Sequence, residues 1–476
     1  MNKSLLRKGA LLLALYLVYL FIGFMLPVYM ARADSVQSSG DMDPEGLYGD
    51  EIGPDKALLL EDPMYSGISR LHLMDQAKEQ IQIAYFSAHD GIASDLFYGT
   101  ILSAANRGVE VQLIFDGIFH NLGRNNRSVY RALVNHPKIE IRFYEPLNLL
   151  KPWTLNNRMH DKFMVVDDTY AMIGGRNIGD KYFLDPYEDE IVKDRDVLIK
   201  RSCFETGEHS VLEDFDKYFG RLWESRYTKE EPLRFSRRQK DSPERKTSEL
   251  LEFRREIEAQ YPDKFPESMD WNGKFHETKG IILTTNSVDR IGKEPRVLMK
   301  LGKLLEGAEQ SAVVQSPYVI PSDRMRQHFD HLQSDHELFI LTNSKAASPN
   351  YFGIAGYLNH REEIHGRADQ IFEYDGRGSV HGKSYIFDQQ ISLVGSFNMD
   401  ARSAFLSTES MVVIDSHSFA KELSGEIEGL VRKSVPYSEE GPSFGAEQAE
   451  IEPVPWYKGV LVKVLRGVLY PFDELL

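Results

Sequence analysis

Short runs of apolar residues with two different periods divide the chain into strands and helices. Residues 80–86 and 109–115 alternate as strands do, and residues 92–106 between them have apolar side chains at helical spacing. A strand, a helix and a second strand predict a right-handed crossover in a largely parallel sheet. The same order returns in the second half of the chain, at residues 311–316, 322–332 and 337–342. The pattern therefore predicts an α/β protein built from two related units.

The longest apolar run lies at the N-terminus. No charged residue occurs between Gly9 and Met30, and a helix of this length can cross a bilayer. Basic residues precede the run, and acidic residues dominate the segment after it. The positive-inside rule then predicts a cytoplasmic N-terminus, with the rest of the chain on the outer side of the cell membrane. Cleavage at the small-residue site Ala31-Arg32-Ala33 would instead give a secreted protein, but the run is longer than a signal-peptide core and favours an anchor over residues 1–33.

Polar segments separate the predicted folded units. Residues 34–56 are acidic and Gly-rich, as in a flexible linker. Residues 229–274 are dense in Arg, Lys, Glu and Pro and form a charged connection, with a helix predicted over Thr247–Gln260. The first unit then covers residues 57–228, and the second covers residues 275–435.

The C-terminal tail, residues 436–476, has a composition of its own. Aromatic and aliphatic residues between Trp456 and Tyr470 are mixed with Lys458, Lys463 and Arg466. This mixture is typical of a helix that lies on an anionic membrane surface. A helix packed on the domain, with its basic residues toward water, would show the same pattern.

The bulk composition narrows the class of protein. At 476 residues the chain is long enough for two or three domains. Its net charge of −16 argues against general nucleic-acid binding, which rewards clustered Lys and Arg. The single cysteine, Cys203, excludes intramolecular disulfides and cysteine-rich zinc sites.

The same short motif occurs twice. His160-Asp161-Lys162 is followed by Asp167, and His381-Gly382-Lys383 is followed by Asp388, so that both copies read H-x-K-x4-D. Each copy continues into a Gly-rich tail that ends in an asparagine, namely Gly174-Gly175-Arg176-Asn177 and Gly395-Ser396-Phe397-Asn398. Two copies with matching tails indicate one site assembled from two homologous halves.

The chemistry of these residues suits phosphodiester transfer. On a strand, residues i and i+2 share a face, so each His lies beside its Lys. One imidazole can attack phosphorus while the other protonates the leaving oxygen. The two ammonium groups, with Asn177, Asn398 and the Ser396 hydroxyl, can stabilise charge on the phosphoryl oxygens. Such a site requires no metal or other cofactor.

These motifs resemble the phospholipase D superfamily, and their flanking strings resemble its bacterial cardiolipin synthase branch. The strings are Asn157-Arg-Met-His-Asp-Lys, Ile173-Gly-Gly-Arg-Asn-Ile-Gly-Asp, Ser316-Pro-Tyr-Val-Ile-Pro, Gly395-Ser-Phe-Asn-Met-Asp-Ala-Arg-Ser and Ser407-Thr-Glu. The resemblance implies two α/β/α halves with mixed sheets about a pseudo-twofold axis. It also implies transfer of a phosphatidyl group through a phosphohistidine, with phosphatidylglycerol as substrate, phosphatidylethanolamine as a second candidate, and no nucleic-acid partner.

The resemblance also assigns acidic partners to the histidines. Asp196 matches the carboxylate that orients the imidazole in one half, and Glu409 matches it in the other. Asp167 and Asp388, the motif aspartates, are more often structural in this family. Ser407 departs from the family, because many relatives carry an Asn there.

Three reaction classes remain open at this point. The first is a membrane phosphatidyltransferase that makes cardiolipin, and the second is a phospholipase D, in which water intercepts the same intermediate. The third is a metal-independent nuclease, which the acidic composition disfavours. Which histidine is the nucleophile does not follow from the sequence. The cluster around His328, His331 and His336 fits the wet face of a helix better than a zinc site.

Overall fold

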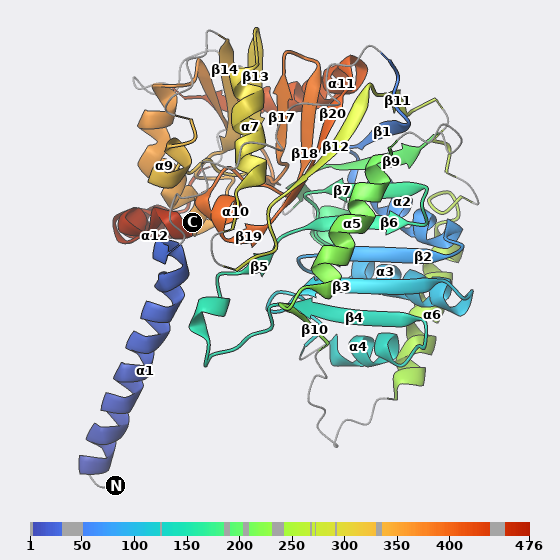
Figure 1. The fold of residues 1–476 in the computed structure, drawn as a ribbon, viewed down its shortest axis with the longest axis horizontal. Helices are drawn as coiled ribbons and strands as arrows, with labels where there is room; N and C mark the ends of the chain where they lie inside the picture. Colours follow the sequence, from blue (N-terminus) through green and yellow to red (C-terminus); the bar gives the residue numbers. More distant parts are fainter. Residues whose placement is uncertain are drawn as a thin grey trace.

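A computed structural model describes residues 3–30, 51–123, 126–184, 191–202, 209–230, 242–266, 269–271, 273–290, 293–329, 336–437 and 453–476. Two α/β halves lie against each other, and one long helix projects from the body (Figure 1). Cys203 and His331 lie outside the described residues. The predicted fold class, two similar halves with mixed sheets and an N-terminal apolar helix, is confirmed.

The first half is built on a mixed sheet. Its strand order is β10 (Thr228–Lys229), β4 (Ile139–Tyr144), β3 (Glu110–Asp116), β2 (Gln80–Tyr85), β6 (Lys162–Val166), β7 (Tyr170–Gly174), β9 (Asp196–Arg201), β1 (Asp55–Leu60) and β11 (His276–Glu277). Strands β2, β3 and β4 are parallel, whereas the other pairings are antiparallel. The expectation of a largely parallel sheet is therefore wrong outside these three strands: β6 and β7 form a hairpin through a short turn, and β9 pairs antiparallel with β7.

Within the described residues, the second half repeats this order for eight strands, and β11 of the first sheet has no counterpart. The sequence along its sheet is β21 (Ser434–Pro436), β15 (Gln370–Tyr374), β14 (Glu337–Asn343), β13 (Ser311–Gln315), β17 (Ser384–Phe387), β18 (Ile391–Gly395), β20 (Ser410–Asp415) and β12 (Gly280–Thr285). Strands β13, β14 and β15 are again the parallel ones. Each His-x-Lys motif precedes or enters the strand beside the first parallel strand, β6 in one half and β17 in the other.

Helices cover the sheets in layers. On the outer face of the first sheet lie α2 (Pro63–Gln76), α3 (Ile92–Asn106), α4 (Arg127–Val134) and α6 (Pro243–Gln260). The outer face of the second sheet carries α7 (Arg296–Glu306), α8 (Asp323–Arg326), α9 (Tyr351–His365), α10 (Ala401–Phe405) and α12 (Trp456–Leu469). Helices α5 (Val211–Glu224) and α11 (His417–Val431) join both sheets in one continuous apolar core. This shared core fixes the two halves relative to each other.

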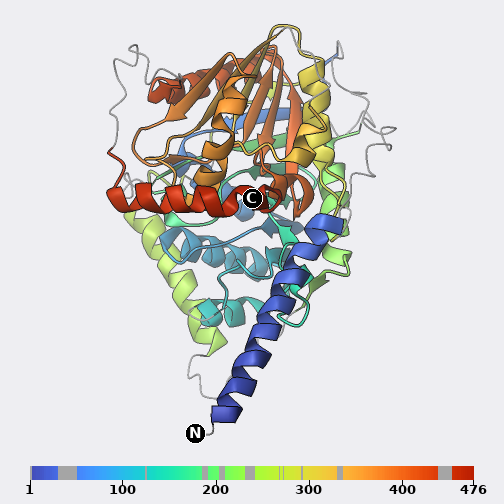
Figure 2. The ribbon, with the colours of Figure 1, turned by 90° about the vertical axis from the view of Figure 1, so that its left-hand side faces the viewer.

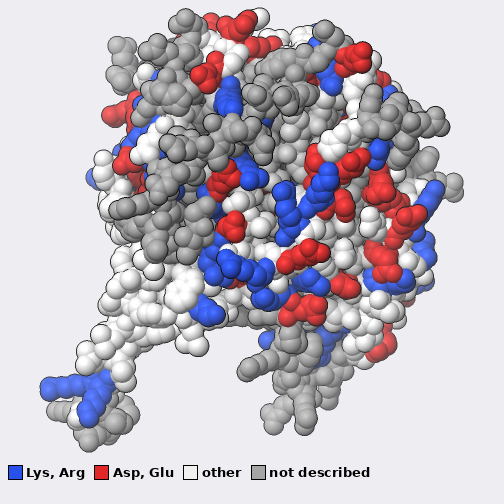
Figure 3. Space-filling view, viewed as in Figure 1, with Lys and Arg blue, Asp and Glu red and all other residues white. Residues whose placement is uncertain are grey.

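Helix α1 (Lys3–Met30) is the element that leaves the body (Figure 2). Its apolar stretch Leu6–Leu26 is long enough to cross a membrane, and only 11% of the most apolar window is buried. In Figure 3 the projecting helix is uncharged along its length and carries basic side chains near its free end, whereas both charges are mixed over the body.

Several predicted elements differ from the structure at their ends. Helix α3 has the predicted bounds, and α6 begins at Pro243, before Thr247, because the Ser242 hydroxyl accepts the Arg245 N–H as an N-cap. The helix expected over residues 322–332 ends at Arg326, where the described chain turns. Strand β1 begins at Asp55, inside the segment predicted as a linker.

Candidate active site

Two short parallel strand pairs cross between the halves and bring their motifs together. In one pair, β5 (Arg158–Met159) of the first half lies beside β19 (Ser407–Thr408) of the second. In the other, β16 (Ser379–Val380) of the second half lies beside β8 (Val192–Lys193) of the first. Exchanging the halves converts one pair into the other, as an approximate twofold relation requires. Each pair ends where a histidine and an acidic residue of opposite halves meet.

Each imidazole contacts a carboxylate of the other half. His160 Nδ1 lies 2.9 Å from Glu409 Oε1, and His381 Nδ1 lies 2.5 Å from Asp194 Oδ2. The backbone aligns these pairs, since the His160 N–H donates to the Thr408 carbonyl at 3.1 Å. Both carboxylates are fully buried. With Nδ1 held in this way, Nε2 of each ring is the atom left for chemistry.

The assignment of Asp196 as a histidine partner is wrong. Asp196 lies opposite Gly174 in the sheet, whereas the residue opposite the equivalent Gly395 is Met411. Counting back two residues from each places Asp194 at the position of Glu409. Residues two apart on a strand share a face, so spacing alone did not separate the two aspartates. Matching the apolar strand residues 197–199 with 412–414 would have separated them.

Asp196 belongs to a buried ionic network behind the site. Its carboxylate accepts from Arg176 Nη1 and Ser66 Oγ, both at 2.7 Å, and pairs with Arg70 Nη2 at 2.7 Å. Arg176 is fully buried, as is Asp196. In the second half the equivalent positions are apolar, with Phe397 in place of Arg176 and Met411 in place of Asp196.

The two lysines lie beside their own histidines. Lys162 Nζ donates to the His160 carbonyl at 2.5 Å, and Lys383 Nζ lies 2.8 Å from His381 Nδ1. Both ammonium groups are buried, and burial lowers the pKa of Lys162 to about 7 and that of Lys383 to about 8. A bound anion would offset this cost and hold both lysines in the charged form.

Burial also lowers the pKa of both imidazoles. The pKa of His160 lies well below its ordinary value, through burial and then through the charges of Lys162 and Lys383. The pKa of His381 falls to about 3, again through burial and then through Lys383, with a smaller contribution from Lys162. Because each ring senses both lysines, the two motifs form one electrostatic site.

The two carboxylates differ in protonation. Burial raises the pKa of Glu409 to about 7, although Lys162 and the Ser396 hydroxyl act in the opposite direction. Burial would also raise the pKa of Asp194, but Lys383 and His381 outweigh it and hold that pKa below its usual range. At neutral pH Asp194 is therefore ionised, whereas Glu409 lies near its midpoint.

The Gly-rich tails lie against the strands that carry the carboxylates. A Cβ atom on Gly174 would come within 2.1 Å of Asp196 Oδ1, and one on Gly395 within 2.2 Å of the Ser410 carbonyl oxygen. Gly175 leaves room for Asp194 in the same way, with 2.3 Å from its Cβ position to Oδ1. Neighbouring backbone and side-chain atoms come so close at these three positions that a residue with a Cβ atom does not fit, which explains why they are glycines.

The predicted phosphate-binding residues have different surroundings. The Ser396 hydroxyl donates its only proton to Glu409. Ser396 therefore positions Glu409 and does not have a proton left for the predicted contact with phosphate. Asn177 and Asn398 are buried, and each Nδ2 lies near a tyrosine hydroxyl. Within the described residues, Oδ1 of both asparagines has no hydrogen-bond partner.

The motif aspartates stabilise turns at the far ends of their strands. Asp167 accepts the backbone N–H groups of Lys78, Glu79 and Gln80. Asp388 does the same for the three residues Glu309, Gln310 and Ser311. Both aspartates have positive φ, 48° and 52°. They follow β6 and β17, whereas the histidines precede these strands, so the aspartates lie at the ends away from the imidazoles.

A cavity of about 510 Å³ reaches His160. Apolar and aromatic side chains line much of it, and the polar groups include Arg402 and Asn398; the full lining is Phe24, Phe86, Ile118, Phe119, Leu155, Asn156, Arg158, His160, Tyr318, Asn350, Asn398, Arg402, Ser403 and Ser407. Among the described residues Arg402 forms no ion pair within 4.0 Å. This size and lining are typical of a site for a small or amphipathic ligand.

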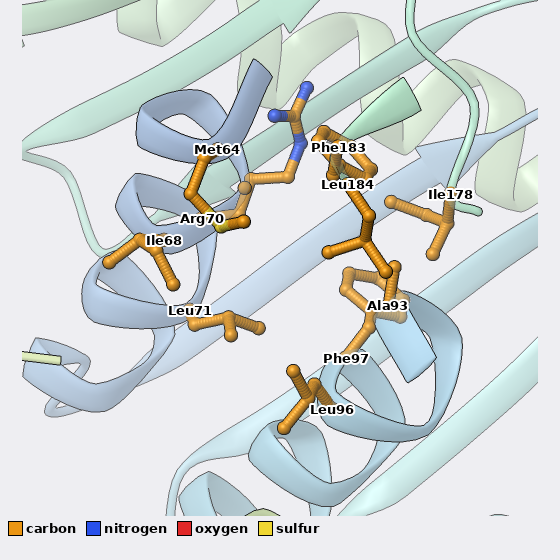
Figure 4. Close-up of a pocket in the computed structure, with 11 residues that line it drawn as sticks. Met64, Ile68, Arg70, Leu71, Ala93, Leu96, Phe97, Ile178, Phe183 and Leu184 are labelled. Atoms are coloured by element: carbon orange, nitrogen blue, oxygen red, sulfur yellow. The ribbon is translucent and has the colours of Figure 1, made fainter. Parts of the chain in front are cut away.

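A smaller apolar cavity of about 40 Å³ lies between α2 and α3 (Figure 4). Ile68 and Leu71 of α2 face Leu96 of α3 and Leu184 across it. It contains none of the predicted site residues and has room for little more than one water molecule. The cavity at His160 is therefore the candidate substrate site.

Two positioning residues were missed in the sequence. Asp116, at the end of β3, accepts the Met159 N–H at 3.0 Å and pairs with Arg158 at 3.1 Å. Asn343, at the equivalent end of β14, accepts the Val380 N–H at 2.8 Å. Each fixes the residue immediately before a motif histidine. In the sequence they could have been found as polar residues at the carboxyl ends of predicted parallel strands, where polar side chains converge.

Comparison with known proteins agrees with the motifs. The family model described as "Cardiolipin synthase, PLD-like domain" matches residues 71–223 and 301–431, together more than half of the chain. Cardiolipin synthase C of Escherichia coli (strain K12) is 27% identical over 404 residues, which cover 76% of this chain and 82% of that protein. An uncharacterized protein of Helicobacter pylori (strain ATCC 700392 / 26695) is also 27% identical, with 77% of both chains covered.

A solved structure shows the same fold. Phosphatidylserine synthase of Haemophilus influenzae Rd KW20 superposes with a TM-score of 0.59 at 13% identity, over 88% of this chain and 95% of that one. With the family model matched in both halves, the resemblance seen in the motifs is confirmed. The chain belongs to the cardiolipin synthase branch of the phospholipase D-like family.

Proposed function

We propose that this phospholipase D-type enzyme is a membrane-associated phosphatidyltransferase that makes cardiolipin from phosphatidylglycerol, with phosphatidylethanolamine as a second candidate substrate. The observation that carries the proposal is the crossed pairing of His160 with Glu409 and of His381 with Asp194 beside two buried lysines. Such a site has two imidazoles, each held at Nδ1 by a carboxylate, and a lysine ammonium group beside each of them, as transfer of a phosphoryl group needs.

The first step forms a covalent intermediate. Nε2 of one histidine attacks phosphorus, the N–P bond forms, and the bond from phosphorus to the leaving alcohol oxygen breaks. The other histidine gives its Nε2 proton to that oxygen, so the alcohol departs neutral. In the second step the alcohol of another lipid gives its proton to the same histidine and attacks the phosphohistidine. Both charges on the lysines face the phosphoryl oxygens throughout.

The two carboxylates favour different roles for the two histidines. Asp194 remains ionised because its pKa lies below the usual range, so it can stabilise a protonated His381. Glu409 has a raised pKa and adds less negative charge beside His160. We assign His381 as the acid and base toward the alcohols, and His160, which lines the large cavity, as the nucleophile. The negative phosphodiester itself raises the lowered pKa of His381 on binding.

Two observations support lipid as the substrate. The cavity at His160 is lined by Phe24, Phe86 and Phe119, which exclude water from a reactive phosphohistidine. Phe24 belongs to α1, the helix long enough to cross a membrane. An enzyme anchored by α1 meets its phospholipid substrates at the surface to which it is bound.

Product analysis tests the proposal. Full-length protein in vesicles of phosphatidylglycerol, with and without phosphatidylethanolamine, should form cardiolipin, identified by mass spectrometry. Both His160→Ala and His381→Ala should lose this activity while keeping the thermal unfolding midpoint of the parent protein. Phosphatidic acid without cardiolipin would make the protein a hydrolase instead. Absence of both products, with the parent protein folded, would overturn the proposal.

A further inference from the structure

The segment between β4 and β5 runs along the membrane-spanning part of α1. Tyr16 Oη donates to the Leu149 carbonyl at 3.1 Å, and Tyr19 Oη donates to the Leu150 carbonyl at 2.7 Å. Higher on the helix, Asn156 Nδ2 donates to the Phe24 carbonyl at 2.6 Å. The segment therefore climbs beside α1 toward the body, as Figure 1 shows for the chain before β5.

We infer that residues 147–153 form a second membrane-inserted element, which packs on α1 and opens the cavity at His160 toward the lipid. Because this inference names the access route of the proposed reaction, it rests on the proposed function. Leu147, Leu149 and Leu150 are exposed apolar side chains on the described surface, with Leu150 76% exposed. Water gives such a row of leucines no stabilisation, whereas a bilayer does.

The depth of the contact supports insertion. Tyr16 precedes Leu26, the end of the apolar stretch, by ten residues, which is about 15 Å along a helix. The leucines beside Tyr16 and Tyr19 then lie well inside a hydrocarbon layer about 30 Å thick. Pro152 packs against Gly23, where a Cβ would come within 2.3 Å of Pro152 Cγ, so the contact is also close at this level of α1.

Hydrogen bonds from protein groups satisfy several backbone groups of the segment, which also contains the charged Lys151. Irregular backbone is tolerated at membrane depth only when its polar groups are satisfied by protein. The two tyrosine hydroxyls satisfy the Leu149 and Leu150 carbonyls. The Leu150 N–H donates to the Asn148 side chain, and the Lys151 N–H donates to the Asn148 carbonyl. A tyrosine hydroxyl inside a spanning helix needs a partner, and this segment supplies it.

Helix α12 marks the level of the membrane surface. It runs crosswise to α1 in Figure 2, and Phe472, just after it, contacts Phe21 of α1 with ring centroids 6.4 Å apart. Its buried side faces α9, and the opposite side carries an exposed apolar stripe of Trp456, Tyr457, Val460, Val464 and Val468. An apolar stripe flanked by Lys463 and Arg466 suits the boundary of an anionic bilayer.

The cavity then faces the lipid. It is lined by Phe24 of α1, by Leu155 and Asn156, which follow the inserted segment, and by His160. A phospholipid with its headgroup at the boundary can move sideways past α1 and the segment, which stay in contact with each other, until its phosphate reaches His160. Arg402, which forms no ion pair among the described residues, is placed in the same cavity to meet that phosphate.

Fluorescence quenching tests the insertion independently of activity. In a Cys203→Ser background, Leu150→Cys, Val464→Cys and Ile52→Cys are labelled with bimane in phosphatidylglycerol vesicles. Spin labels deep in the acyl chains should quench the bimane at position 150, and shallow spin labels should quench the bimane at position 464. Neither kind should quench the bimane at position 52, an exposed apolar site just before β1. Quenching at 150 by aqueous iodide alone, or a disulfide between two copies at 150, would overturn the inference.

An activity measurement separates this inference from the proposed function. Leu149→Asn with Leu150→Asn should lower transfer between vesicle lipids at least about tenfold, since two leucines leave the hydrocarbon. Turnover of a water-soluble short-chain phosphodiester should stay unchanged, and Val134→Asn, an exposed residue of α4, should change neither rate. Equal loss on both substrates would overturn the inference. An inactive parent protein would instead overturn the proposed function, and the quenching result would still stand.

Discussion

His160 with Glu409 and His381 with Asp194 occupy equivalent places in two sheets of the same strand order, yet their surroundings differ. The Ser396 hydroxyl contacts Glu409, whereas Gly175 stands at the equivalent position beside Asp194. Burial raises the pKa of Glu409, while Lys383 and His381 keep that of Asp194 low. Duplication has therefore kept the positions of the reacting groups and changed their charge.

The layer behind each pair differs as well. In the first half, Asp196 with Arg70 and Arg176 forms a buried ionic network. In the second half, Met411 and Phe397 fill the equivalent space. A buried ion pair has a desolvation cost that an apolar pair of similar volume avoids. The comparison indicates that the chemistry requires the contact between carboxylate and imidazole. The side chains packed behind that contact can be ionic or apolar.

The largest expected effect is on Asp194. Asp194→Asn keeps the size of the side chain and removes the charge that stabilises protonated His381. Turnover should fall by about 10³–10⁴-fold, as expected when the carboxylate that orients a catalytic imidazole is neutralised. Steady-state rates of lipid transfer measure the loss, and an unchanged thermal unfolding midpoint serves as the control. A loss below tenfold would remove Asp194 from the site.

The next effect separates Asp196 from Asp194. Asp196→Asn leaves Arg70 and Arg176 buried without a counter-charge, which should cost about 3–5 kcal/mol of folding stability. Turnover per folded molecule should remain within tenfold of the parent. The matched change in the other half, Met411→Leu, conserves volume and should cost less than about 1.5 kcal/mol. Thermal unfolding in detergent measures both, and equal stability of the two variants would contradict the ionic role.

The smallest effect is on the pH profile. Glu409 has a pKa raised to about 7, so it becomes protonated as the pH falls through 7. Protonated Glu409 donates to His160 Nδ1, which leaves the ring proton on Nε2 and blocks attack on phosphorus. Activity should therefore fall below about pH 7.

Ser396→Ala sharpens this result. The Ser396 hydroxyl lowers the pKa of Glu409, so its loss should move the acid limb of kcat/KM to higher pH. Ser392→Ala is the matched control, because this buried hydroxyl has no hydrogen-bond partner within the described residues. A limb that moves to lower pH in Ser396→Ala, or moves equally in both variants, would contradict the account.

Much of the fold follows from the sequence. The periodicity of residues 80–115 and the doubled motif predicted two α/β halves, and the bounds of α3 are those predicted. The antiparallel strands after each motif were harder to assign, because apolar runs do not reveal strand direction. Helix α8 is short because residues after Arg326 turn, and apolar spacing alone did not show it.

The site was predictable in its residue types and less so in its pairings. His160, Lys162, His381, Lys383 and Glu409 lie together, as the motifs indicated. The exchange of partners between halves depends on β5 with β19 and β8 with β16, pairings of residues far apart in sequence. No local pattern encodes such contacts. The contribution of Phe24 to the cavity also depends on tertiary packing of α1.

We propose that one active site divides its chemistry unequally between two half-sites, with His160 as the nucleophile. The most direct measurement uses a phosphatidyl ester with an activated leaving group, which departs without an acid. In His381→Ala, rapid alkaline quenching and peptide mass spectrometry should find the phosphatidyl group on His160, whereas His160→Ala should form no adduct. An adduct on His381 in the His160→Ala variant would contradict the account.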